Sequence, residues 1–148
     1  MGIFSGLRGT SSEALDVSTA VMVPIVAAIL ADGSVEDSEI DQVRSICAWS
    51  PIYARNTREQ DTDIIVRAIR LVEGEGREAM CRKAAEALSP ALRETAFAFA
   101  VRMVFADGHV GSAEEALIEQ LVQWLSIDGA RARSFVEVIS TMQHNASA

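Results

Sequence analysis

The chain has 148 residues, which is enough for one domain and too few for two of ordinary size. Hydrophobic residues make up 49% of the sequence and charged residues 23%, which predicts a folded domain and excludes a disordered chain. The formal net charge of −8 excludes a broad nucleic-acid-binding surface, because the phosphate backbone repels an acidic protein.

Apolar residues recur at three- and four-residue steps through nearly the whole chain, which predicts an all-α fold of about seven helices in a single domain, residues 12–142. A flexible N-terminal segment, residues 1–11, and a disordered tail, residues 143–148, are expected to flank it. The predicted helices cover about residues 12–31, 37–49, 59–73, 77–88, 90–106, 112–125 and 128–142.

Several residues predict where these helices begin, end or bend. Pro24 predicts a kink or a break in the first helix. Ser89, which precedes a proline, and Asp128 are typical N-caps. Ser112, followed three residues later by Glu115, predicts a capping box.

The sequence contains an internal repeat with a shift of 75 residues, which places residues 26–33 on residues 101–108 and Trp49 on Trp124. Apolar positions match apolar positions with a helical period. The repeat predicts two similar helical hairpins packed about a pseudo-twofold axis, with both tryptophans in the core.

The most similar part of the repeat is a turn, Ala-Asp-Gly-x-Val, followed by Glu four residues after the Val. It gives Asp32 and Glu39 in the first copy and Asp107 and Glu114 in the second. One copy has a purely structural explanation, because Gly permits the positive φ at a helix end and Glu suits the first turn of a helix.

Two copies also predict a metal site if the turns converge. Two carboxylates about 4 Å apart repel each other by roughly 4 kcal/mol, so they would stay apart, hold protons or bind a cation. Oxygen ligands favour Ca²⁺ or Mg²⁺. The turn is not an EF-hand loop, because its first and third ligand positions would be Ala28 and Leu30.

No pattern in the sequence predicts catalysis. Residues 74–79 match a dinucleotide-binding fingerprint but follow a predicted helix rather than a strand. The two histidines, His109 and His144, form no zinc-binding pattern, and no nucleophile elbow is present. We therefore expect a protein that is not an enzyme.

The N-terminus lacks the features of a secretory signal, and the longest apolar run, residues 21–31, is too short to span a bilayer. Cys47 and Cys81 form no metal-binding or redox motif, which predicts two buried thiols. These features predict a cytoplasmic protein with no transmembrane segment.

The paired Ala-Asp-Gly-x-Val-x-x-x-Glu motifs, the opening Met-Gly-Ile-Phe and the Leu-Arg-Glu-Thr-Ala stretch at residues 92–96 resemble the TerB-like (tellurite-resistance protein B) family. The resemblance covers about residues 10–142. It implies an all-α fold, no established enzymatic activity and a role in tellurite and stress responses through protein partners at the inner membrane face. It also implies metal binding by Asp32, Glu39, Asp107 and Glu114.

The leading hypothesis is therefore a non-enzymatic stress-response module that binds Ca²⁺ or Mg²⁺ through these four carboxylates and engages protein partners. The alternative is a metal-free helical interaction domain whose acidic ends or central arginines dock a partner. Those arginines, on residues 44–93, are otherwise expected to form local ion pairs such as Asp63 with Arg67.

Overall fold

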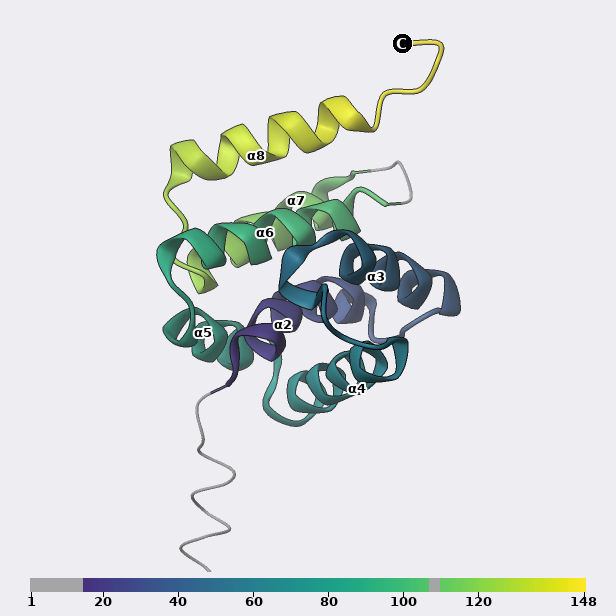
Figure 1. The fold of residues 1–148 in the computed structure, drawn as a ribbon. Helices are drawn as coiled ribbons and strands as arrows, with labels where there is room; N and C mark the ends of the chain where they lie inside the picture. Colours follow the sequence, from purple (N-terminus) through teal and green to yellow (C-terminus); the bar gives the residue numbers. More distant parts are fainter. Residues whose placement is uncertain (1–14, 107–109) are drawn as a thin grey trace, which may run out of the picture.

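A computed structural model describes residues 15–106 and 110–148, and it confirms the all-α prediction. The described part of the chain is helical and contains no strand (Figure 1). In chain order the helices are α2 (Val17–Ile29), η1 (Leu30–Asp32), α3 (Asp37–Trp49), η2 (Pro51–Tyr53), α4 (Arg58–Glu75), α5 (Arg77–Ala87), α6 (Pro90–Val104), α7 (Ser112–Trp124) and α8 (Gly129–Met142).

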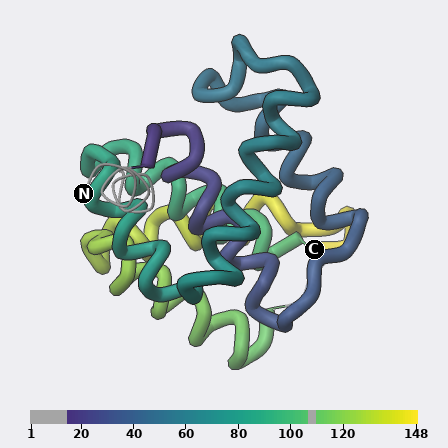
Figure 2. The backbone as a smooth tube through the Cα atoms, turned by 90° about the horizontal axis from the view of Figure 1, so that it is seen from below, coloured from purple at the N-terminus to yellow at the C-terminus, as the bar shows by residue number. Residues whose placement is uncertain are grey.

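Helix α2 is the centre of the fold, and its main neighbours are α6, α4 and α5 (Figures 1 and 2). Ten of its 13 residues are buried. A helix that is apolar all round must be covered on every side, so the sequence of α2 itself requires a central position. The helix continues through Pro24, so the break that the sequence suggested there does not occur.

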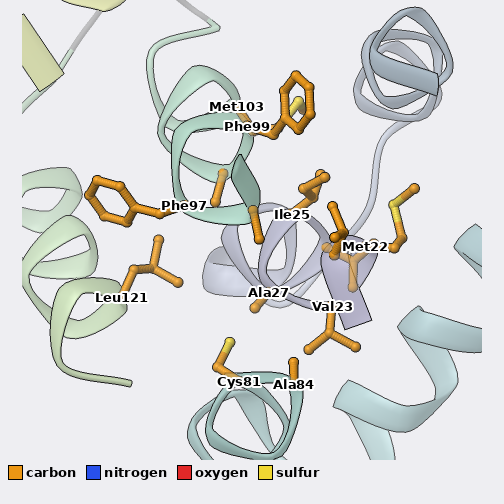
Figure 3. Close-up of a cluster of buried hydrophobic side chains, with 14 of the residues drawn as sticks. Met22, Val23, Ile25, Ala27, Cys81, Ala84, Phe97, Phe99, Met103 and Leu121 are labelled. Carbon is orange, nitrogen blue, oxygen red and sulfur yellow. The ribbon is translucent and has the colours of Figure 1, made fainter. Parts of the chain in front are cut away.

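Side chains from the neighbouring helices pack on different sides of α2 (Figure 3). Phe97 of α6 and Leu121 of α7 lie on one side of α2, and Cys81 and Ala84 of α5 lie on another. Phe97, Leu121, Cys81 and Ala84 are all fully buried, as are Met22 and Val23 of α2 itself. Both cysteines of the chain are free and buried, as predicted.

The helix boundaries follow local capping chemistry. Ser89 accepts a hydrogen bond from the backbone N–H of Leu92, and Asp128 accepts one from that of Arg131, which confirms both predicted caps. The expected capping box at Ser112 is wrong, because Ser112 is the first helical residue and Gly111 occupies the cap position without a side-chain bond.

The two repeated segments have the same local form. In each, an apolar helix (α2 or α6) is followed by a 13-residue helix (α3 or α7). The pseudo-twofold relation between them stays a prediction. The matched tryptophans differ, because Trp124 is 7% exposed whereas Trp49 is 74% exposed, so the core assignment of Trp49 is wrong.

Helix α8 is the outermost helix and packs against α6 (Figure 1). Its one buried residue is Ala132, and Phe135, Val136 and Ile139 are partly buried against the core. The proposed N-terminal segment, residues 1–11, lies outside the described residues, and no helix follows Met142. None of the helices in the described ranges is both long and apolar enough to cross a bilayer.

Candidate cation site at the Asp-Gly turns

One pocket of about 250 Å³ lies where the repeated segments meet. Its walls come from the end of α2 and η1, the start of α3, the end of α6 and the start of α7. The carboxylates of Asp32, Glu39 and Glu114 line it. The remaining lining residues form a mostly apolar wall: Ala28, Ile29, Ala31, Met103, Val104, Ala113 and Leu117.

Asp32 is positioned by the turn that ends η1. Gly33 has φ +89°, a conformation that L side chains rarely adopt, and this reverses the chain after the helix. The Asp32 carboxylate accepts a hydrogen bond from the backbone N–H of Ser34 at 3.2 Å. Asp32 is exposed, so its carboxylate is open to solvent as well as to the pocket.

Glu39 is held by a capping box that sequence reasoning missed. Its side chain accepts a hydrogen bond from the backbone N–H of Glu36 at 2.9 Å, and the Glu36 side chain accepts one from the Glu39 backbone. Glu36 is thus the N-cap of α3. The signal was present, since Glu36 and Glu39 are three residues apart just before an amphipathic helix.

The electrostatics of Glu39 show that the acidic groups interact. Burial raises the pKa of Glu39, and the neighbouring charges of Asp32 and Glu36 raise it further. The hydrogen bond from the Glu36 backbone opposes this rise in pKa. Ionised Glu39 is therefore less favourable in the folded chain than in water, as expected for a carboxylate that faces other carboxylates.

Glu114 comes from the other repeat, in the first turn of α7. It is partly buried and lines the same pocket as Asp32 and Glu39. Three of the four predicted ligands thus border one pocket, although they are separated by up to 82 positions in the sequence. The fourth, Asp107, lies outside the described residues.

The described side chains that line this pocket do not by themselves form a complete metal-binding site. Within residues 15–106 and 110–148, no three Asp, Glu, His or Cys side chains lie close enough together to hold a metal ion. The donor set still has the chemistry that a hard cation requires, because it consists of carboxylate oxygens.

No curated protein and no solved structure matches the chain. A family model described as tellurite resistance protein TerB matches residues 18–135. The matched region runs from the start of α2 into α8 and includes both Asp-Gly turns. This match covers most of the sequence, and it confirms the resemblance drawn from the repeated motif. The chain therefore belongs to the TerB family.

Proposed function

We propose that this protein is a non-enzymatic tellurite-resistance and stress-response module that binds a hard divalent cation, Ca²⁺ or Mg²⁺, between its two Asp-Gly turns. The observation that supports the proposal is the pocket that Asp32 and Glu39 from one repeat line together with Glu114 from the other. Asp107 would complete the ligand set, since it is the repeat equivalent of Asp32.

The cation would act by linking the two repeated segments. With no ion bound, ionised Glu39 is disfavoured by burial and by the charge of Asp32. A divalent ion would offset this repulsion and join the start of α3 to the start of α7. Because it would bind only the folded arrangement, it would stabilise the protein by mass action, by about 2.7 kcal/mol at a free concentration 100 times its Kd.

Thermal melting tests the cation site directly. The protein is melted in chelator and then with increasing Ca²⁺ or Mg²⁺ at constant ionic strength. We expect Tm to rise and then saturate with at least one of the two ions. The variants Asp32→Asn, Asp107→Asn and Glu114→Gln should each lose most of this rise.

Glu115 provides the matched control for Glu114. Both are acidic residues in the first turn of α7, but Glu115 is exposed and does not line the pocket. Glu115→Gln should therefore keep the full cation response. An equal loss of response in Glu114→Gln and Glu115→Gln, or no saturable response in the wild type, would exclude the site.

We further propose that the protein acts in the cytoplasm through protein partners at the inner membrane face, as its family suggests. Tellurite survival of cells that lack the native gene tests the cellular role. If the cation site serves this role, Glu115→Gln should restore survival and Glu114→Gln should not.

The alternative is a metal-free interaction domain, and the exposure of Trp49 favours it. A tryptophan that is 74% exposed is unusual on a monomer and typical of binding surfaces. In this case Trp49→Ala should abolish tellurite survival, whereas Glu114→Gln should restore survival like the wild type. Loss of survival in Glu114→Gln alone would favour the cation-dependent function.

A further inference from the structure

A second pocket, larger than the cation pocket, lies between α3, η2 and the start of α4. Its volume is about 530 Å³. We call it the arginine pocket and define it by six of its lining residues: Arg44, Ser45, Tyr53, Asn56, Arg58 and Asp61. The connection from α3 to α4, which contributes Tyr53 and Asn56, projects from the body of the molecule (Figure 2).

The most informative group in this pocket is the guanidinium of Arg44. Its side chain is partly buried, and its Nη1 atom is fully buried without a hydrogen-bond partner in the described part of the chain. Buried polar atoms are almost always hydrogen-bonded, and a charged donor without an acceptor is especially unfavourable. Nη1 of Arg44 is therefore a donor for which the described residues supply no acceptor.

Four other polar side chains of the pocket are already engaged within the protein. Asp61 accepts a hydrogen bond from Nδ2 of Asn56 at 3.0 Å. The hydroxyl of Ser45 donates to the backbone carbonyl of Gln42 at 2.6 Å, and the buried Tyr53 donates to that of Ser18 at 2.7 Å. These bonds fix the walls of the pocket and leave its arginines as the available donors.

Both arginines lack an ionic partner within the described residues. The ion pairs there involve Arg67, Arg82 and Arg131, and none involves Arg44 or Arg58. Arg58 is the first residue of α4, so the positive end of that 18-residue helix adds to the charge of the two guanidinium groups. Planar guanidinium groups bind carboxylate and phosphate oxygens well.

We propose that the arginine pocket binds a small ligand through an oxyanion group, carboxylate or phosphate, which Arg44 and Arg58 hold. Asp41 and Asp61 also line the pocket, so its charge is balanced rather than broadly basic. This balance favours a small ligand with one localised anionic group over a polyanion, which both carboxylates would repel. The inference is independent of the cation site, because the two pockets share no residue.

Amide NMR of the full chain tests this proposal, with inorganic phosphate and succinate as separate probes and sodium chloride as the ionic-strength reference. We expect saturable shifts at Arg44, Ala48 and Ala54, which line the pocket, with at least one probe and not with chloride. The probe that saturates at lower concentration identifies the oxyanion class, phosphate or carboxylate.

Three variants of equal charge change locate the binding site. Arg44→Gln and Arg58→Gln should each weaken binding about tenfold or more, as expected for losing a charge-assisted hydrogen bond. Arg55→Gln is the control, because Arg55 is exposed in the same connection but does not line the pocket. It should bind like the wild type.

The outcomes are distinct. Equal weakening in all three variants would show a general charge effect and overturn the proposal, as would the absence of saturation with both probes. If Arg44→Gln fails to fold, the comparison of Arg58→Gln with Arg55→Gln decides alone, because both of these side chains are exposed. A loss of cation response with intact oxyanion binding would affect only the proposed function.

Discussion

Arg131 donates two hydrogen bonds to the carboxylate of Glu94, from Nε at 3.1 Å and from Nη2 at 3.0 Å, and thereby joins α8 to α6. The same guanidinium lies over the ring of Phe135, 4.9 Å from its centroid. Such bidentate geometry is favourable for an arginine–carboxylate pair. Ala132 is the one buried residue of α8, and Phe135, Val136 and Ile139 are partly buried against the core, so the ion pair adds to an attachment that is mainly apolar.

The pair predicts a pH-dependent stability. The hydrogen bonds from Arg131 hold the pKa of Glu94 below its ordinary value of 4.5. A lowered carboxylate pKa stabilises the folded state above the unfolded pKa, and this stabilisation is lost as the pH falls through the folded pKa. Glu94→Gln should therefore be less stable than the wild type at neutral pH, and this difference should disappear in acid.

Urea unfolding of the wild type and Glu94→Gln, from about pH 3 to pH 7, measures this difference in stability. The effect should be small and should shrink in concentrated salt, because the pair is at the surface. Glu119→Gln is a suitable control, because Glu119 is exposed on α7 and forms no ion pair with another described residue. A Glu94→Gln difference that stays constant down to the lowest pH would contradict the assigned role of the ion pair.

The contribution of Glu39 to the stability of the fold should depend on pH in the opposite direction to that of Glu94. Its pKa is raised by burial and by the charges of Asp32 and Glu36, so its ionisation destabilises the folded state above the folded pKa. Glu39→Gln keeps an oxygen that can accept the Glu36 backbone hydrogen bond but removes the charge. In chelator, we expect this variant to be at least as stable as the wild type at pH 7, with the difference vanishing below about pH 4.

The comparison variant is Glu39→Ala, which removes both the charge and the capping bond. It should be less stable than Glu39→Gln at every pH, by about 1 kcal/mol. If Glu39→Gln were as unstable as Glu39→Ala at neutral pH, the ionised carboxylate would be stabilising, and the repulsion from Asp32 would not be the dominant effect.

The helix ends could be predicted because they depend on a few adjacent residues. The bounds of α3, Asp37–Trp49, agree with the prediction because Ser50 and Pro51 stop the helix. The end of α4 lies later than the predicted residue 73, since Gly74 remains helical and Gly76, with φ +94°, ends the helix. Which of two nearby glycines ends a helix depends on the packing of its last turn, which local sequence does not encode.

The tertiary partners could not be predicted from local spacing. Arg67 pairs with Asp16, at 3.6 Å, rather than with Asp63 on its own helix. This choice arises because α2 packs against α4 and brings a carboxylate from another element within reach. The exposure of Trp49 also depends on tertiary packing, because the last turn of α3 buries Ile46 and Cys47 and leaves Trp49 on its exposed side.

The sequence predicted which residues line the candidate site but not how their side chains are oriented. The repeat indicated that similar helix ends would meet, and Asp32, Glu39 and Glu114 do border one pocket. The sequence did not indicate how the side chains would be oriented. Glu39 bonds to the Glu36 backbone, and this orientation depends on the local geometry of the α3 N-terminus.

Thr57 is the N-cap of α4, and its substitution should show how much this cap contributes to stability. Its hydroxyl accepts a hydrogen bond from the Gln60 backbone at 3.1 Å, and the Gln60 side chain accepts one from the Thr57 backbone at 2.8 Å. Thr57→Ala should lower the free energy of unfolding by about 1 kcal/mol, and Thr57→Ser should lower it much less. Urea denaturation measures both, and equal losses in the two variants would argue against the hydroxyl as the source.

The two tryptophans predict unequal effects of the same substitution. Trp124 is 7% exposed, so Trp124→Ala should cost about 3–5 kcal/mol of stability. Trp49 is 74% exposed and retains mainly an edge-on contact with Phe99, 6.1 Å between ring centroids, so Trp49→Ala should cost about 1 kcal/mol. Chemical denaturation measures both, and similar losses would indicate that Trp49 is buried in solution.

The reaction rates of the two buried thiols with a thiol reagent should report which part of the fold opens first. Burial raises the pKa of Cys47 and of Cys81 to about 12 each, so very little reactive thiolate exists near pH 8. A thiol reagent should therefore modify the native protein slowly and the protein in guanidinium rapidly. Cys47 lines the arginine pocket, whereas Cys81 lies in the core beneath α2, so opening α3 locally exposes Cys47 first.

Single-cysteine variants separate the two rates. Cys81→Ala leaves Cys47, which should react faster than the protein unfolds globally. Cys47→Ala leaves Cys81, whose reaction should follow global unfolding and change with denaturant accordingly, since α5 and α2 cannot separate without loss of the core. Equal rates for both thiols would mean that α3 unfolds only together with the rest of the protein, and the wall of the arginine pocket would then be as stable as the core.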